Sequence, residues 1–346
     1  METNLLIVGQ GLAGTVLGWE LERAGVPFRI ADEGHARAAS RVAAGIINPI
    51  TGQRIVKSWR VDTLLPLARE TYRAIEGALG VPLWREMRVR RLFREESERR
   101  VLAEKQTRGD LLDYAGASDG DGFWIEGAAR VDAAALMAAS RERWRAAGVL
   151  REERVDLRRA REEHSLVIDC TGALRPEPGE GGPAFDFVPW QFSKGECLTI
   201  AIDGLAPDVV LNCRHWVVPL EGAGAKVGAT HGPGRCDATP TEAARTELEE
   251  AAARMTARTF TTVAHEAGVR SYLADKKPVV GRHPTDARLG VMNGLGAKGG
   301  LFAPALARQW VRHLVEGASF DPELDVARWW RTPRKAGPSQ KSVVRR

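Results

Sequence analysis

Cysteine is scarce in this sequence, and its spacing excludes the sites that cysteines usually build. The chain has 346 residues but four cysteines, which lie far apart. Such spacing fits neither a disulfide framework nor a zinc site. We therefore expect no metal site and a cytoplasmic protein, with free thiols at Cys170, Cys197, Cys213 and Cys236.

Long apolar runs are also lacking. No stretch is long enough to span a bilayer, so we expect no transmembrane segment and no membrane partner. The first apolar run, Asn4 to Val8, leads directly into a glycine turn, and we do not expect it to be a signal peptide. With 44% hydrophobic and 27% charged residues, the composition is that of a globular protein, and its length suits two linked domains.

Acidic residues are absent from the last part of the chain, residues 332–346. This segment contains five basic residues, whereas the whole chain has a net charge of +5, so the remainder has no net charge. We expect a solvated, disordered tail, and an RNA-contacting arm is the alternative. The basic residues are Arg334, Lys335, Lys341, Arg345 and Arg346.

Near its start the sequence carries a glycine pattern between two short apolar runs. Asn4 to Val8 leads into GQGLAG, and Asp32 ends the next apolar run. Gly9 permits a tight turn, Gly11 lets a pyrophosphate approach the backbone, and Gly14 lets the following helix pack close to the strand. The helix start offers free N–H donors to phosphates, and Asp32 is placed to accept hydrogen bonds from a ribose. The pattern predicts a site for an ADP-containing dinucleotide, without saying which one.

Apolar periodicity predicts further helices and strands. Helical periodicity occurs at Asp62–Leu79, Ser97–Gln106, Asp132–Ala147, Thr241–Ala257 and Leu301–Glu316. Alternation typical of an antiparallel sheet occurs at Val89–Phe93, Gly195–Ile202, Trp216–Leu220 and Lys226–Thr230.

Two later stretches extend the nucleotide-binding pattern. Leu166–Ile168 is an apolar strand that ends in the small-residue turn Asp169–Gly172, and it can return to the parallel sheet beside the dinucleotide. The loop Gly294–Gly300 opens a helix and offers a second set of backbone donors, to which Lys298 adds a positive charge. Two glycine–helix units suit an extended cofactor, whereas a nicotinamide dehydrogenase needs the first alone.

Together these segments resemble the FAD-dependent D-amino-acid oxidase superfamily, and within it the glycine oxidase and sarcosine oxidase-like branch. The resemblance implies an α/β fold, with a Rossmann-like FAD-binding domain interleaved with an antiparallel-sheet substrate domain. It places the FAD-binding domain at 1–80, 130–180 and 275–330, and the substrate domain at 81–129 and 181–274. The strings that carry it are GQGLAG with Asp32, KGECL at Lys194–Leu198, HWVVP at His215–Pro219, VGAT at Val227–Thr230 and GVRSYLADKKPVVGRHP at Gly268–Pro284.

The resemblance also implies which residues contact FAD. Sarcosine oxidase-like members carry a flavin-linking cysteine in the stretch between Arg270 and Lys298, where this chain has none, so we expect non-covalent FAD. The implied contacts are Gly9, Gly11, Leu12, Ala13, Gly14 and Asp32 at the ADP half, Ala44 and Gly45 near the flavin, Val155 near the adenine, Thr171 and Gly172 at the adenosine, and Gly296, Ala297, Lys298, Gly299 and Gly300 at the pyrimidine edge of the flavin.

The expected catalytic residues are Arg270, Lys298, Trp216 and His231. A planar guanidinium binds a carboxylate through two hydrogen bonds, and Arg270 aligns with the carboxylate-binding arginine of the family. An ion pair within a strand is the alternative role for Arg270. Trp216 matches a substrate-facing tyrosine of glycine oxidase but cannot supply its hydroxyl, and His231 matches another pocket position. Packing is the alternative role for both.

The implied reaction is oxidation of the C–N bond of an amino acid or N-substituted glycine. Hydride would pass from the carbon beside a neutral amine to the flavin, the imine would hydrolyse, and oxygen or another acceptor would take the electrons. Lys298 would stabilise the reduced flavin.

Two other functions stay open at this point. The final loop has Ala297 where glycine oxidase has an arginine, and it looks more like the loop of tRNA-modifying oxidoreductases that cleave carboxymethylaminomethyl uridine. The other alternative is a non-catalytic flavin-binding protein. The polar segment Asn48–Arg54 either lines the substrate entrance or simply turns.

Overall fold

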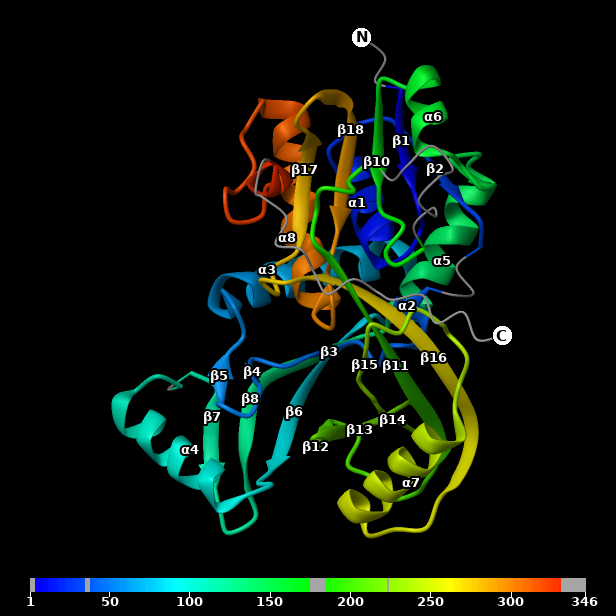
Figure 1. Ribbon diagram of the computed structural model, residues 1–346. Coiled ribbons are helices and arrows are strands. Elements are labelled where there is room, and N and C mark those ends of the chain that lie inside the picture. The colour runs from blue at the N-terminus through cyan, green and yellow to red at the C-terminus, as the bar shows by residue number, and fades with distance from the viewer. Residues whose placement is uncertain (1–3, 35–37, 112, 175–183, 223, 331–346) are drawn as a thin grey trace, which may run out of the picture.

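Two β-sheets, joined by a chain that passes repeatedly between them, form the protein (Figure 1). The computed structural model describes residues 4–34, 38–111, 113–174, 184–222 and 224–330. Residues 332–346 lie outside these ranges, so the disordered tail and its alternative as an RNA arm stay predictions. Within the described ranges, no helix combines the length and apolar character that crossing a membrane takes.

The first sheet has six strands in the order β17-β18-β10-β1-β2-β9. Neighbouring strands from β18 to β9 run parallel, and β17 forms an antiparallel edge with β18. The central strands β1 and β10 are buried along their whole length, as expected for continuous apolar runs in a parallel sheet. The strands are β1 Leu5–Val8, β2 Phe28–Asp32, β9 Leu150–Glu152, β10 Leu166–Asp169, β17 Val279–His283 and β18 Asp286–Asn293.

The second sheet has the order β15-β11-β14-β13-β12-β6-β8-β3, with β16 paired to β11 and β7 paired to β8. Its pairs are antiparallel except for β6 and β12, which run parallel. Figure 1 shows β11 and β16 side by side along the length of this sheet. The strands are β3 Ile46–Ile47, β6 Trp84–Leu92, β7 Ala115–Ser118, β8 Gly122–Val131, β11 Trp190–Ala201, β12 Val209–Cys213, β13 His215–Pro219, β14 Ala225–Gly228, β15 Gly232–Pro233 and β16 Thr261–Leu273.

The helices divide between the two sheets. Around the first sheet, α1 packs against α8 and α5, and α3 packs against α8, whereas α7 lies on the second sheet (Figure 1). A short hairpin of β4 (Ile50–Thr51) and β5 (Val56–Lys57) lies outside both sheets. The helices are α1 Leu12–Arg23, α2 Ala39–Val42, α3 Val61–Leu79, α4 Glu96–Arg108, α5 Ala133–Ala146, α6 Leu157–Glu163, α7 Glu242–Thr256, α8 Gly299–Glu316 and the 3-10 helix η2 Val326–Trp329.

The helices and strands predicted from periodicity are confirmed, with ends that differ by a few residues. Periodicity missed β8 and β16, although β16 carries Arg270. The residues of β16 are mostly half-buried along its first part, so its alternation is weak. Its extended shape depends on pairing with β11, which lies some seventy residues earlier in the chain.

The predicted domain ranges stay a prediction, and one strand departs from them. Every strand of the first sheet falls within 1–80, 130–180 or 275–330. However, β3, which lies within 1–80, pairs with β8 in the second sheet. The segment that contains β3 therefore passes from one sheet to the other.

Gly45 fixes this crossing. Its φ is +73°, and its carbonyl accepts a hydrogen bond of 2.9 Å from the Val131 amide. A Cβ at Gly45 would lie 1.8 Å from the Val131 carbonyl oxygen, so a side chain cannot fit without moving the backbone. Glycine at this position lets β3 approach β8.

We expect Gly45→Ala to lower the melting temperature more than Gly25→Ala does. Gly25 has a similar φ of +68°, but a Cβ there meets no atom within 4 Å. The control therefore carries the cost of a left-handed alanine alone, about 1–2 kcal/mol, without the clash. Equal losses in thermal unfolding of the two variants would contradict this account of the crossing.

Candidate functional site

The turn after β1 is shaped by close backbone approaches. Gly9 has a φ of +98°, and a Cβ there would lie 2.8 Å from the Cys170 carbonyl oxygen. A Cβ at Gly14 would lie 2.0 Å from the Gly9 carbonyl oxygen, whereas a Cβ at Gly11 would meet nothing within 4 Å. Gly11 caps α1 without a side-chain hydrogen bond. Gly9 and Gly14 therefore permit the close packing that the sequence predicts. Gly11 faces open space at a helix N-terminus, and its contact with a pyrophosphate stays a prediction.

Asp32, at the end of β2, holds this turn in place. Its carboxylate accepts hydrogen bonds from the amides of Gln10 (2.7 Å) and Gly34 (2.9 Å) and from the guanidinium of Arg141 (2.9 Å). These use about three of the roughly four acceptor positions of a carboxylate, which leaves one for a ligand. The sequence analysis missed Arg141, because its position in an amphipathic helix gives no sign that it reaches β2.

A cavity of about 570 Å³ extends from this turn to β16 and the final glycine loop. Such an elongated space joins the two ends of the predicted site. The predicted residues that line it are Gly9, Gly11, Leu12, Ala13, Asp32, Val155, Thr171, Gly172, Arg270 and Gly296. Cys170, in the predicted turn Asp169–Gly172, also lines it, as do Ser40, Asp237, Ser271 and Asn293, which were not predicted.

Several predicted contacts pack behind the cavity wall instead. Gly14 faces Gly9, and Gly45 faces Val131, as described above. Ala44 is buried in the core of the second sheet. Cβ atoms at Gly299 and Gly300 would meet Leu12 (3.1 Å) and Ile47 (3.3 Å). The predicted contacts of these five glycine and alanine residues with FAD stay predictions.

Asn293 joins three parts of the cavity wall. It is buried at the end of β18, and its side-chain amide donates to the Gly172 carbonyl (3.0 Å). Its Oδ1 accepts from the Ser271 hydroxyl (2.8 Å) and from the Gly294 amide (2.7 Å). It therefore fixes the final glycine loop relative to β10 and β16. The Asn-Gly pair that follows an apolar run was a turn signal that the sequence analysis did not use.

Arg270 lies across the surface of β11. A Cβ at Gly195 would lie 2.1 Å from a guanidinium nitrogen of Arg270, so the missing side chain of Gly195 makes room for it. Burial lowers the pKa of Arg270, which the nearby Cys197 and Tyr272 partly offset. Among the described residues, no carboxylate pairs with this guanidinium, so the alternative role of an ion pair within the strand has no support there.

His231 lies near Arg270, whereas Trp216 lies on β13, two strands away from β11. A Cβ at Gly228 would lie 2.8 Å from both the Trp216 indole and the Cys197 thiol, so the indole covers Gly228. Ser193 and His231 Nδ1 are 2.9 Å apart. Burial and then the charge of Arg270 lower the pKa of His231. The structure thus brings Arg270 and His231 together. Trp216 lies beside the Cys197 thiol, which is also near Arg270.

A second cavity, of about 350 Å³, begins at the next residues of the final loop. Gly296 lines the first cavity, whereas Ala297 and Lys298 line the second, together with Trp216. Lys298 Nζ donates to the Thr51 hydroxyl (3.3 Å), and burial lowers the pKa of its ammonium group. Four residues of the unassigned segment 48–54 line this cavity, namely Asn48, Ile50, Thr51 and Gly52. The segment forms a cavity wall.

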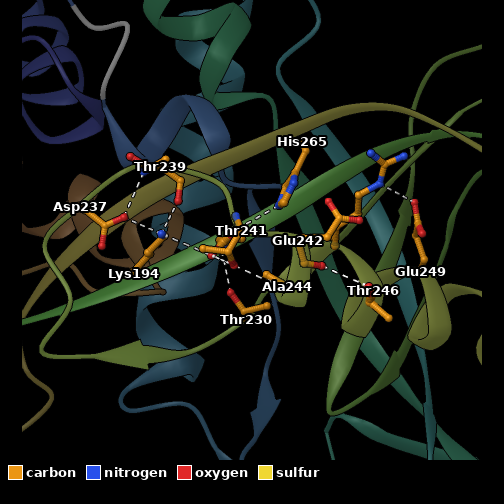
Figure 2. A network of polar contacts seen from close by, with 12 residues as sticks. Lys194, Thr230, Asp237, Thr239, Thr241, Glu242, Ala244, Thr246, Glu249 and His265 are labelled. Carbon is orange, nitrogen blue, oxygen red and sulfur yellow. Dashed lines mark hydrogen bonds and ion pairs between the residues drawn. The ribbon is translucent and has the colours of Figure 1, made fainter.

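Side chains on the opposite face of β11 hold a segment that lines the first cavity, and Figure 2 shows the polar contacts of this network. Lys194, which is fully buried, donates to the Asp237 carboxylate (2.6 Å) and to the Thr239 carbonyl. Glu196 accepts from the amide (2.7 Å) and hydroxyl (3.0 Å) of Thr241 and lies 3.0 Å from His265. Because Asp237 lines the cavity, this network holds the segment against it.

The comparisons with known proteins agree with this geometry. Residues 4–312 match the family described as FAD dependent oxidoreductase. Glycine oxidase from Geobacillus kaustophilus has a TM-score of 0.75 at 22% identity, over 92% of this chain and 96% of that chain. Iminodiacetate oxidase (IdaA) from Chelativorans sp. BNC1 has a TM-score of 0.72 at 21% identity, over 92% and 98%. The predicted resemblance and fold class are confirmed.

A longer protein is also similar to this chain. It is the tRNA 5-methylaminomethyl-2-thiouridine biosynthesis bifunctional protein MnmC of Maricaulis maris (strain MCS10), which is 28% identical over 333 residues. The match covers 90% of this chain and 52% of that protein. The chain therefore spans about half the length of this relative.

We expect Asp32→Ala to weaken FAD binding about ten- to hundredfold, because a hydrogen bond to a charged group contributes about 1.5–3 kcal/mol. Titration of the FAD-free variant, followed by flavin fluorescence, measures the loss. Glu152→Ala is the control, since the exposed Glu152 contacts the far side of Arg141 (2.9 Å) but does not line the cavity. Wild-type affinity in Asp32→Ala would contradict the assignment.

Proposed function

The chain belongs to the family of FAD-dependent oxidoreductases, and from that membership we propose that it oxidises the C–N bond of an amino acid or N-substituted glycine. The family makes it an enzyme, which sets aside the alternative of a non-catalytic flavin-binding protein. The two oxidases with similar folds act on glycine and iminodiacetate by their names, and both compounds present a carboxylate beside an amine.

The described residues fit FAD as the cofactor. Gly11 leaves open space beside the start of α1, where a pyrophosphate finds backbone donors. The carboxylate of Asp32 lines the same cavity for a ribose, and the cavity continues to Arg270 and Gly296. When bound there, FAD supplies a hydride acceptor. Non-covalent attachment stays a prediction, since Cys170 and Cys236 line this cavity.

The observation that carries the proposal is the guanidinium of Arg270. It is largely removed from water and lacks a carboxylate partner among the described residues. Leaving such a charge unpaired is costly, and a substrate carboxylate would offset the cost through two charged hydrogen bonds. A substrate held in this way as the free amine needs orientation more than it needs a strong side-chain base. The imine product would then hydrolyse in water.

We expect Arg270→Ala to lower kcat/KM about a hundredfold or more for sarcosine or another carboxylate-bearing amine, with the FAD content unchanged. Arg270→Lys should recover part of the loss, because an ammonium keeps the charge but not the two-point geometry. Initial rates of peroxide formation, or of reduction of an artificial acceptor, measure the effect. An equal loss with a matched amine that lacks the carboxylate would assign Arg270 to folding or cofactor binding.

A second candidate function is oxidation of a carboxymethylaminomethyl group on tRNA. The specific observation that favours it is the match of 90% of this chain to about half of the Maricaulis maris protein. A carboxymethylamino group is itself an N-substituted glycine, so Arg270 would serve the same role. The two candidates differ in what the glycine nitrogen carries.

For this second candidate we expect the full chain to bind tRNA and to lose affinity when residues 332–346 are removed, because that segment holds five basic residues and no acid. Filter binding at several salt concentrations measures this. Failure of the intact, FAD-loaded protein to bind tRNA would remove the candidate and leave the small-molecule oxidase.

A further inference from the structure

The second cavity has a charge pattern that Arg270 chemistry does not explain. Its wall carries four basic side chains and, among the described residues, no carboxylate. They come from β6 and the loop after it, from the turn between β12 and β13, and from the final loop. They are Arg91, Arg94, Arg214 and Lys298.

Few carboxylates form ion pairs with these four cations. Arg91 and Arg94 share the buried carboxylate of Glu98, at 3.2 and 3.4 Å. Arg214 lies 3.6 Å from Glu247, which also pairs with His215. Lys298 donates to a hydroxyl, and within the described ranges no carboxylate pairs with it. Four cations against two carboxylates leave an excess of two positive charges around the cavity.

Arg94 and Arg214 are exposed at the rim of this cavity, whereas Arg91 and Lys298 are withdrawn from water. The side chain of Arg91 is 5% exposed, and burial lowers the pKa values of both Arg91 and Lys298. Cations of like sign that are gathered in a hollow repel one another and lose hydration. An anion in the cavity would relieve both costs, and its charged hydrogen bonds would be strong in a partly desolvated site.

The cavity also lies next to the proposed substrate position. Adjacent residues of the final loop line the two cavities, Gly296 the first and Ala297 the second. Trp216, in the wall of the second cavity, flanks the Cys197 thiol; burial raises the pKa of this thiol, and the nearby charge of Arg270 partly offsets that effect. A substrate whose carboxylate is on Arg270 would therefore direct its nitrogen substituent toward the second cavity.

We propose that the second cavity is a subsite for a second anionic group, so that the substrate is an N-substituted glycine whose substituent ends in a carboxylate or a phosphonate. This inference rests on the proposed function. It assigns the three arginines of the cavity to selectivity, and Arg270 to the carboxylate that both kinds of substrate share.

Binding of unreactive analogues tests the subsite directly. Thiodiacetate and (ethylthio)acetate share the thioether and one carboxylate, lack the amine and differ in the second carboxylate. A phosphonate analogue distinguishes the two anion classes. We expect one of the two dianions, thiodiacetate or the phosphonate analogue, to bind the FAD-loaded full chain at least about tenfold more tightly than (ethylthio)acetate. The flavin absorbance follows the binding. Equal affinities for all analogues would overturn the inference.

Substitutions of the arginines test whether the second cavity causes the preference for dianions. Arg94→Gln combined with Arg214→Gln, at two exposed positions, should remove most of the dianion preference. Arg100→Gln is the matched control, since Arg100 is exposed on α4 but does not line the cavity. A double variant that weakens both ligands by the same factor, or one that keeps the preference, would contradict the assignment.

Turnover separates this inference from the proposed function. Iminodiacetate should be preferred over N-ethylglycine in kcat/KM by about tenfold. If both are oxidised equally well, the subsite is wrong but the proposed function stands. If neither reduces the flavin under anaerobic conditions, the proposed function itself fails. Binding of tRNA that the double variant abolishes, without any dianion preference, would assign these cations to an RNA contact and overturn the inference.

Discussion

The close approach of three backbone segments at Gly9, Gly14 and Cys170 is the constraint on which the rest of the site depends. A side chain at Gly9 or Gly14 would press into a carbonyl oxygen within 3 Å. Because no side chain intervenes, the start of α1 sits directly over the ends of β1 and β10. The helix N-terminus, with its free donors and partial positive charge, therefore opens into the cavity. Asp32 and Arg141 then fix the neighbouring strand around the same turn.

Small residues also make room for large side chains on one face of the second sheet. Gly195 and Cys197 alternate along β11 and so share one face, and Gly228 faces Cys197 from β14. Because this face carries so few large side chains, Arg270 and Trp216 lie across it, and they line the first and the second cavity respectively. The intervening residues of β11, Lys194 and Glu196, point to the opposite face and carry the polar network of Figure 2. One strand thus supports the site on one face and anchors the segment around Asp237 from the other.

The sequence predicted those features whose cause is local. The glycine turn, its helix and the place of Asp32 at the end of β2 follow from spacing, and the structure shows each of them. The family resemblance added Arg270 and the final loop, although β16 itself was not predicted, because its conformation depends on pairing with a distant strand. Arg141 and Asn293 were missed for the same reason: each acts through partners that lie more than one hundred positions away in the chain. The cations of the second cavity come from three separate segments, so no spacing in the sequence points to them.

The central claim is that a carboxylate-binding arginine orients an amine for oxidation in an FAD enzyme. Anaerobic titration of the purified, FAD-loaded protein with N-substituted glycines, read from the flavin absorbance, tests it most directly. The account predicts bleaching by a carboxylate-bearing amine such as sarcosine or iminodiacetate, and far slower bleaching by the matched amines without a carboxylate. A flavin that stays oxidised with every glycine derivative and amino acid tested would contradict it.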